Sequence, residues 1–491
     1  MSVIIGLPSG LHSPELEIML SKSQEILDNG EDLILVSCSG GSGYACSFNI
    51  YGSAAICYSC KCLTRKAVST LKGEFEFVKT PEINNKLKVK EIENTIQGRL
   101  DLKRFKFHNV DVGQASYSSY LGLSRDLEID GYLSTYSINK LLRTSISYTL
   151  FLESIFYSQK ITKVIIYNGR HNQTRPFLRL GQINNVTVEV MEFSGQDSSC
   201  VYVFQNNLPQ DIKLLELKMQ FSWDSLKEKF SESIPYYYKI KRNGGVVNDK
   251  KSFTASQVTG FIPLSFNNLV HNVVIFNSSE DEYASLGEEY ESLIYKNQSD
   301  AIERITSSLS SFENIKIWIR IHPNLKAVRW NFIRRVYKLE TLYKNVSVIY
   351  PDSNVSTYTL LDSCNTVVSF GSTIGIEASY WGKPSVLIGR SSYENLGSVY
   401  VPKSHSEVIS LLKDEKLKPL PRDGAEKFGL HWIKGGVSIK YFEGDRNNGF
   451  TFNKFNFSKN LIEYVFFAIG KLIEIYILGF INYLFRKNKI S

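Results

Sequence analysis

The sequence has 491 residues, of which 43% are hydrophobic, and it carries a formal net charge of +8. A chain of this length is too long for one hydrophobic core, so we expect two domains. The charge is modest for the size, and no run of basic residues interleaved with aromatic residues occurs, which argues against a nucleic-acid-binding protein.

The N-terminal half opens with a strand pattern followed by a helix start. The segment SVIIGLP (Ser2–Pro8) predicts a buried strand, and Ser13, Pro14 and Glu15 supply the cap, first-turn proline and early acid of a helix. The N-terminus lacks the features of a secretory signal, so we expect a cytosolic protein with reduced cysteines. Further buried strands are predicted at Asp32–Cys38, Lys163–Gly169 and Val186–Phe193.

The second half alternates apolar strands with helix-patterned segments. Strands are predicted at Val273–Ser279, Ile315–Pro323, Val346–Pro351, Thr366–Gly371 and Pro384–Gly389. Helices are predicted at Asp300–Ser311, Phe332–Tyr343, Thr357–Ser363 and Thr373–Trp381. Short continuous apolar strands that alternate with helices predict βαβ units and a parallel sheet covered on both faces.

These patterns predict an α/β protein with two Rossmann-like, doubly wound domains facing a cleft, followed by a C-terminal helical tail. The polar segment Lys239–Ser252 has the composition of an interdomain linker. We therefore expect an N-terminal domain over residues 1–250, a second domain over residues 251–425 and a C-terminal extension over residues 426–491.

Polar clusters follow three strands of the second domain. They are Ser278–Glu282, Arg320–Asn324 and Gly371–Thr373, the last with Glu377 about one helical turn beyond. Ligands of open parallel sheets bind beyond the carboxyl ends of the strands, and helix N–H groups there favour anions. Each cluster alone also fits a capped helix or loop, but their convergence on one sheet edge favours a binding site.

The series SSEDEY, WIRIHPNL and SFGSTIGIEASYWGKP resembles bacterial capsular and surface polysaccharide biosynthesis proteins with the GT-B glycosyltransferase fold. The segments HSPELE (His12–Glu17), SCSGGSGYAC and YNGR (Tyr167–Arg170) fit related surface-carbohydrate proteins. The resemblance covers most of Ser2–Leu412. It implies a nucleotide-activated sugar held mainly by the C-terminal domain and an acceptor bound mainly by the N-terminal domain.

The donor side of such a reaction must hold a phosphate, a sugar and a ribose. We expect Glu377 to accept hydrogen bonds from the ribose and His322 also to act in catalysis. The full set of expected donor-binding residues is Ser278, Ser279, Arg320, His322, Gly371, Ser372, Thr373 and Glu377. Helix N-termini and side chains can stabilise the leaving phosphate, so we expect neither a metal nor another cofactor. The acids Glu280–Glu282 fit a helix start better than a metal site.

The acceptor side needs a base for an inverting reaction. We expect His12 and Glu15, in the loop after the first strand, to act in catalysis, although Glu15 is also explained as a first-turn helix acid. Arg170 and Arg175 are expected to face an anionic acceptor, with solvated surface arginines as the alternative.

Two further features each leave two interpretations open. Cys38, Cys46, Cys57 and Cys60 fit either reduced thiols packed in a glycine-rich loop or, less well, a structural zinc site. The apolar tail Leu461–Phe485 ends in Arg486, Lys487 and Lys489. It fits either a helix on an anionic membrane surface or a helix packed back onto the protein.

The expected function is a glycosyltransferase that moves a sugar from a nucleotide-activated donor to a capsule or O-antigen acceptor, in a lipid-linked form. Its partners would be the nucleotide sugar, the glycan acceptor and, through the tail, the inner face of the plasma membrane. Two alternatives are a nucleotide-sugar 2-epimerase of the same fold, which needs no acceptor, and a non-catalytic polysaccharide assembly protein, which binds no nucleotide sugar.

Overall fold

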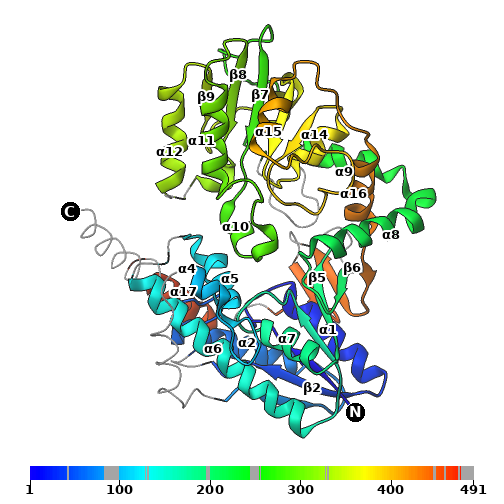
Figure 1. Cartoon of the computed structure of the whole chain (residues 1–491). Coiled ribbons are helices and arrows are strands. Elements are labelled where there is room, and N and C mark those ends of the chain that lie inside the picture. Colours follow the sequence, from blue (N-terminus) through cyan, green and yellow to red (C-terminus); the bar gives the residue numbers. More distant parts are fainter. Residues whose placement is uncertain are drawn as a thin grey trace. The chain divides into compact units, whose positions relative to one another are not determined.

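A computed structural model describes residues 1–40, 44–81, 99–127, 132–194, 200–243, 256–326, 331–445, 449–457 and 461–473, together with residues 129, 254, 328 and 476. The chain folds into two compact units, shown in Figure 1. Unit 1 comprises Met1–Pro209 and Gly436–Ser491, and unit 2 comprises Gln210–Gly435. Among the described helices, none is long and apolar enough to cross a membrane.

Unit 1 is built on a seven-stranded sheet with the order β12-β6-β5-β4-β1-β2-β3. Its strands are β1 (Ser2–Gly6), β2 (Asp32–Ser37), β3 (Glu76–Lys79), β4 (Ile161–Tyr167), β5 (Thr187–Phe193), β6 (Cys200–Gln205) and β12 (Val437–Ser438). Strands β1 to β5 are parallel, while β6 and β12 run antiparallel to their neighbours. The central strands are buried almost end to end, because both faces of the sheet are covered.

The helices of unit 1 are α1 (Glu15–Asp28), α2 (Ala54–Val68), α4 (Arg99–Arg104), α5 (Val112–Ser124), α6 (Tyr132–Ser158), α7 (Arg175–Ile183) and α17 (Leu461–Leu472). A hairpin of β13 (Phe442–Asp445) and β14 (Gly449–Phe452) completes the unit. Phe442, Phe450 and Phe452 of this hairpin pack into the same core as α1 and strands β1, β2 and β4. The end of the chain therefore returns to the first unit.

Unit 2 is built on a five-stranded, all-parallel sheet with the order β11-β10-β7-β8-β9. Its strands are β7 (His271–Phe276), β8 (Ile315–Arg320), β9 (Val346–Ile349), β10 (Thr366–Ser369) and β11 (Ser385–Leu387). Its helical elements are α8 (Ile212–Phe230), α9 (Ser233–Arg242), α10 (Glu280–Ala284), η1 (Glu288–Tyr290), α11 (Gln298–Leu309), η2 (Pro323–Leu325), α12 (Asn331–Leu342), α13 (Thr357–Ser363), α14 (Ile374–Tyr380), α15 (His405–Lys413) and α16 (Asp423–Lys434). Every strand predicted in this half is present.

Helices α8 and α9 belong to unit 2, although they precede the expected domain boundary at residue 250. Tyr238 of α9 stacks on Tyr380 of α14 with ring centroids 3.6 Å apart, and its hydroxyl donates to the Ala425 carbonyl at 2.5 Å. Ser222 of α8 is 2.8 Å from Nδ1 of His431 in α16. The division at residues 209 and 435 thus differs from the expected one, because packing on α14 and α16 outweighs proximity along the chain.

The predicted α/β class with two Rossmann-like sheets and a helical C-terminal segment is confirmed. The segment Lys239–Ser252, expected to be a linker, begins inside α9, and its remaining part after residue 243 lies outside the described residues. The expected extension over residues 426–491 is divided: α16 belongs to unit 2, whereas the hairpin and α17 belong to unit 1.

Candidate functional site

The sheet of unit 2 reverses its winding between β7 and β10. From β7 the chain adds β8 and β9 on one side, and then β10 and β11 on the other. The carboxyl ends of the two strands flanking such a reversal form the crevice in which doubly wound sheets bind ligands. Ser278 and Ser279 follow β7, and Gly371, Ser372 and Thr373 follow β10. These five sequence-predicted donor residues therefore follow the two strands that flank the reversal.

The loop after β8 is fixed to the loop after β7. The backbone N–H of His322 donates to the side chain of Asn277 at 2.7 Å, and Nδ1 of His322 accepts from the backbone of Asn324 at 3.1 Å. His322 thus caps its own loop, as the alternative interpretation predicted. The same bond places the proton of the neutral ring on Nε2, the nitrogen that can donate to a phosphate oxygen.

Gly371 is required by its backbone conformation and its surroundings. Its φ is 110°, and a Cβ atom there would lie 2.5 Å from the Arg390 carbonyl oxygen. No larger residue fits without displacing the loop after β11. This close approach brings Arg390 beside the crevice, where its guanidinium is held by a bidentate ion pair with Glu394 at 2.9 Å.

Glu377 lies in a buried polar network instead of at an open edge. Its side chain is 3% exposed, one oxygen accepts from the Tyr358 hydroxyl at 2.5 Å, and the other is 3.6 Å from Nζ of Lys241. Lys241 also donates to the Thr373 hydroxyl at 3.4 Å. Thr373 makes no side-chain cap to α14, so its hydroxyl is oriented by this lysine. A ribose would have to displace one of these partners from Glu377.

Arg320 is directed away from the crevice. The residue is 2% exposed, and its guanidinium donates to the carbonyls of Tyr350 at 2.5 Å and Ser353 at 3.3 Å. Burial lowers its pKa to about 10, with Asp352 acting in the opposite direction. An arginine in this position organises the loop after β9, so we assign it a structural role in place of the expected charge at the donor.

Exposure separates the expected donor residues into two groups. His322, Ser372 and Thr373 are half-buried and can meet a ligand, whereas the remaining five are buried: Ser278, Ser279, Arg320, Gly371 and Glu377. Sequence reasoning missed Lys241 and Arg390. Arg390 follows a predicted strand and could have been found by the same strand-end rule, but nothing in the sequence places Lys241 beside Thr373.

The sheet of unit 1 has its own reversal, between β1 and β4. His12, in the loop after β1, pairs through Nδ1 with Glu15 and packs against the Phe48 ring with centroids 3.9 Å apart. The loop after β4 carries Arg170, whose Nε is 3.5 Å from Nε2 of His171. Burial lowers the pKa of His171 well below its ordinary value, and the nearby Arg170, His12 and Arg175 lower it further. His12 and His171 thus lie close together, and His171 was missed by the sequence reasoning.

Glu17 is a second residue that sequence reasoning passed over in this loop region. It is 3% exposed, and its Oε2 has no hydrogen-bond partner among the described residues. Burial raises its pKa from 4.5 to about 7, against the smaller opposing effects of Ser13 and His12. A buried carboxyl group with a pKa near neutrality is a recurrent property of acid–base sites.

Arg175 contradicts its predicted role as an acceptor contact. Its side chain is 2% exposed, and Nε lies 3.7 Å from Oδ2 of Asp111. Arg179 joins the same carboxylate with two hydrogen bonds of 2.9 Å. Burial raises the pKa of Asp111, but the two arginines outweigh it and bring the value to about 2. This buried ion-pair network connects α7 to the start of α5, so Arg175 is structural, while Arg170 remains half-buried and available for contact.

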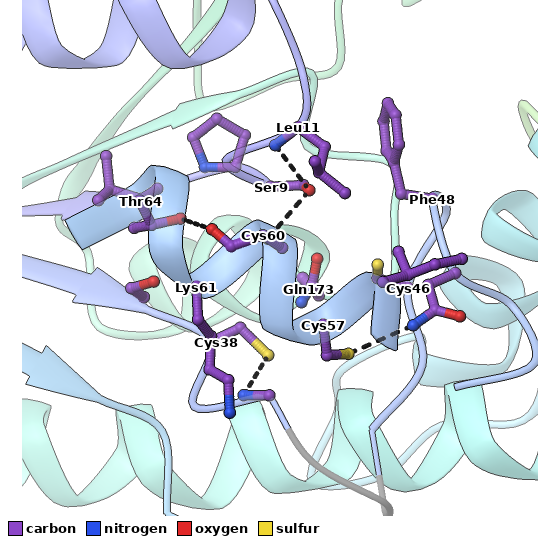
Figure 2. A pocket seen from close by; sticks show the side chains of 16 residues that line it. Ser9, Leu11, Cys38, Cys46, Phe48, Cys57, Cys60, Lys61, Thr64 and Gln173 are labelled. Carbon is purple, nitrogen blue, oxygen red and sulfur yellow. Dashed lines mark hydrogen bonds between the residues drawn. The ribbon is translucent and has the colours of Figure 1, made fainter. Parts of the chain in front are cut away.

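The cysteines line a small pocket in unit 1, shown in Figure 2. Cys57 and Cys60 project from α2, Cys38 follows β2, and Cys46 comes from the loop before α2. The space that the centres of water molecules could occupy is about 40 Å³, enough for a few waters and far too small for a nucleotide. The pocket also contains Phe48, the ring against which His12 packs.

Two of the pocket thiols, those of Cys38 and Cys46, are held in the neutral form by burial. Burial raises the pKa of Cys38 to about 12, and burial together with the neighbouring thiols raises that of Cys46 well above 9. Among the described residues, no three His, Cys, Asp or Glu side chains are placed to hold a metal ion. The other interpretation, reduced thiols packed in a glycine-rich loop, holds only in part, because Cys57 and Cys60 lie in a helix.

Solved structures that resemble this chain include Kdo transferases and UDP-GlcNAc 2-epimerases. KpsC, beta Kdo 2,4 transferase from Thermosulfurimonas dismutans is 16% identical with a TM-score of 0.36, over 55% of this chain and 79% of that one. The UDP-GlcNAc 2-epimerase from Neisseria meningitidis bound to UDP-GlcNAc is 10% identical with a TM-score of 0.25, over 88% and 99%. These values carry no argument about activity. No curated protein gives a significant match.

A family model gives the informative match. Residues 274–406 match the model described as capsule polysaccharide biosynthesis protein. The matched range begins inside β7 and contains β8 to β11, all the expected donor residues and the loop of Arg390. Residues 274–406 are thus similar to the family of capsule polysaccharide biosynthesis proteins.

Proposed function

We propose that the protein is a glycosyltransferase that moves a sugar from a nucleotide-activated donor to a capsule or O-antigen acceptor. The observation that carries the proposal is the location of the polar crevice at the β7–β10 reversal inside the range matched by the family model. Half-buried hydroxyl and imidazole groups there, with Lys241 beside them, suit the phosphates of a nucleotide sugar.

The roles follow the exposure of each residue. Ser372, Thr373 and His322 would contact the diphosphate or sugar, and Lys241 would supply positive charge once a phosphate competes with Glu377 for it. Ser278, Ser279 and Gly371 would shape the crevice. We retain Glu377 as the ribose contact, on the condition that the ribose replaces Lys241 or Tyr358 as its partner.

In unit 1, His12 with Glu15 would act on the acceptor hydroxyl, and Arg170 would face an anionic group of the acceptor. We further propose that the acceptor is lipid-linked, that the protein works at the inner face of the plasma membrane, and that the reaction needs no metal. Side chains and helix N-termini can offset the charge of the leaving phosphate without a cation.

A thermal-shift screen with UDP, CMP, CDP and GDP sugars tests the donor site first. We expect one nucleotide class to raise the melting temperature, because a ligand that binds only the folded state stabilises it. Sugar transfer to acceptor extract is then measured in EDTA. Nucleotide release that is independent of the extract would indicate an epimerase, and no stabilisation by any nucleotide sugar would indicate an assembly protein.

A further inference from the structure

Helix α17 is attached to unit 1 along one side. Its Glu463 is 6% exposed, and the Glu463 carbonyl accepts a hydrogen bond from the Ser59 hydroxyl of α2 at 2.7 Å. Gly470 approaches α2 so closely that a Cβ atom would lie 2.5 Å from Ile56. Lys471 donates to the carbonyl of Phe48 at 3.5 Å. The packed-helix interpretation of the tail is therefore correct for this side, as Figure 1 shows for α17 and α2.

The opposite side of α17 is apolar and exposed. Its large side chains are 40–68% exposed. They recur at spacings of three and four residues and therefore lie within an arc of about 120° on an ideal helix. We call this set the α17 stripe: Ile462, Val465, Phe466, Ile469, Leu472, Ile473 and Tyr476. Tyr58 of α2, 44% exposed, contacts Phe466 and extends the stripe onto the neighbouring helix.

The charged residues of α17 do not interrupt the stripe. Glu463 and Lys471 are the charged residues among Leu461–Leu472, and both interact with the protein side. In the fold Glu463 is buried and Lys471 donates to the Phe48 carbonyl, so the stripe itself keeps only apolar and aromatic groups.

Charge decides between the occupants of such a surface. The sequence after the helix remains apolar to Phe485 and then ends in Arg486, Lys487 and Lys489, in a segment outside the described residues. A second copy of the chain would bring the same basic cluster, whereas an anionic bilayer supplies the opposite charge. Aromatic and aliphatic side chains beside basic residues are typical of helices that lie in the headgroup region.

We propose that the α17 stripe lies in the interface of an anionic lipid bilayer, with the helix parallel to the surface and α2 holding it from the protein side. The biological role of this membrane contact rests on the proposed function, because the contact would bring the enzyme to a lipid-linked acceptor. The contact itself requires only the stripe and the basic end.

Co-sedimentation of the full-length protein with vesicles of equal parts phosphatidylcholine and phosphatidylglycerol tests the inference. Removing two apolar side chains from the stripe, with Ile469→Ser and Leu472→Ser together, should lower the partition coefficient about tenfold or more. The matched control is Leu217→Ser with Phe221→Ser on α8, where the side chains are 67% and 72% exposed. The control variant should bind like wild type.

Three results would overturn the proposal: equal binding by the stripe variant and wild type, equal loss in the control variant, or a wild-type dimer that binds no vesicles and dissociates in the stripe variant. Binding to pure phosphatidylcholine vesicles should be weaker, which confirms the part of the basic end. Nucleotide-sugar stabilisation is measured on the same variants. If the wild-type protein binds a nucleotide sugar but no vesicles, only this inference fails. If the wild-type protein binds vesicles but no nucleotide sugar, only the proposed function fails.

Discussion

The two units share the order of their five parallel strands and differ in the chemistry at the point where that order reverses. In unit 2 the crevice between β7 and β10 is edged by hydroxyls, one imidazole and a lysine held by Glu377. In unit 1 the corresponding position between β1 and β4 carries two neighbouring histidines and two carboxyl groups. The first set suits an anion that must be held, and the second suits a proton that must be moved.

In both units, the charge of a side chain is a poor predictor of its exposure to solvent. Of the five charged residues that sequence reasoning placed in the sites besides the histidines, Arg320, Arg175 and Glu377 are at most 3% exposed, whereas Glu15 and Arg170 are half-buried. Each of the three buried residues joins a buried network with backbone carbonyls, Asp111 or Lys241. A buried charge needs compensation, so these residues organise the loops that carry the half-buried groups.

The largest expected effect is on turnover, and it tests whether unit 1 carries the group that moves a proton. If His12 is the base for the acceptor hydroxyl, His12→Ala should lower turnover about 10²- to 10⁴-fold with little change in donor affinity. His108→Ala is the matched control, because His108 also pairs with a carboxylate, Glu153, at 2.9 Å in the same unit. Transfer kinetics on both variants measure the difference. Equal turnover in the two variants would remove His12 from catalysis.

Arg320 tests whether a strand-end charge in unit 2 is structural. Arg320→Met leaves the carbonyls of Tyr350 and Ser353 without their donor, so the free energy of unfolding should fall by about 3 kcal/mol. Chemical denaturation measures this free energy of unfolding. The control is Arg335→Met, because the Arg335–Glu303 pair is exposed and should contribute under about 1 kcal/mol to stability. Unchanged stability with lost nucleotide affinity would return Arg320 to the donor site.

The pH dependence of unfolding sharpens the view of unit 1. The pKa of Glu17 is about 7 in the folded protein and 4.5 ordinarily, so the folded state binds the proton more tightly. The stabilisation is complete below pH 4.5 and is lost as the pH rises through 7. Glu17→Gln should therefore match wild type near pH 4.5 and exceed its unfolding free energy at higher pH, by up to about 3 kcal/mol. Glu31→Gln, at an exposed carboxylate, is the control variant and is measured over the same pH range. A difference between Glu17→Gln and wild type that does not change with pH would contradict the burial of the Glu17 charge.

The smallest expected effect is on nucleotide-sugar affinity, and replacing Lys241 tests whether unit 2 binds an anion. Lys241→Met should weaken nucleotide-sugar binding about tenfold, because the variant loses one charged hydrogen bond to a phosphate. Calorimetric titration measures it against Lys239→Met, an exposed lysine on the same helix. A lower melting temperature with unaltered affinity would mean that Lys241 serves only as the partner of Glu377.

The sequence by itself determined the fold class and the location of the crevice in unit 2. Five continuous apolar strands, each followed by a helix pattern, leave a parallel sheet as the arrangement that covers both faces, and its carboxyl edge follows from the strand direction. His12, Ser372, Thr373 and His322 were found this way because local order along the chain places them directly after strands.

Only the tertiary structure decided the domain membership of α8, α9 and the C-terminal hairpin, and which charged side chains are buried. Lys241 reaches Thr373 across 132 residues, and Phe442 enters a core begun by Val3, so no local pattern encodes either contact. The same holds for α17, which packs on α2, a helix from the beginning of the chain. Burial depends on what packs against a residue, and for these residues the partner comes from a distant part of the chain.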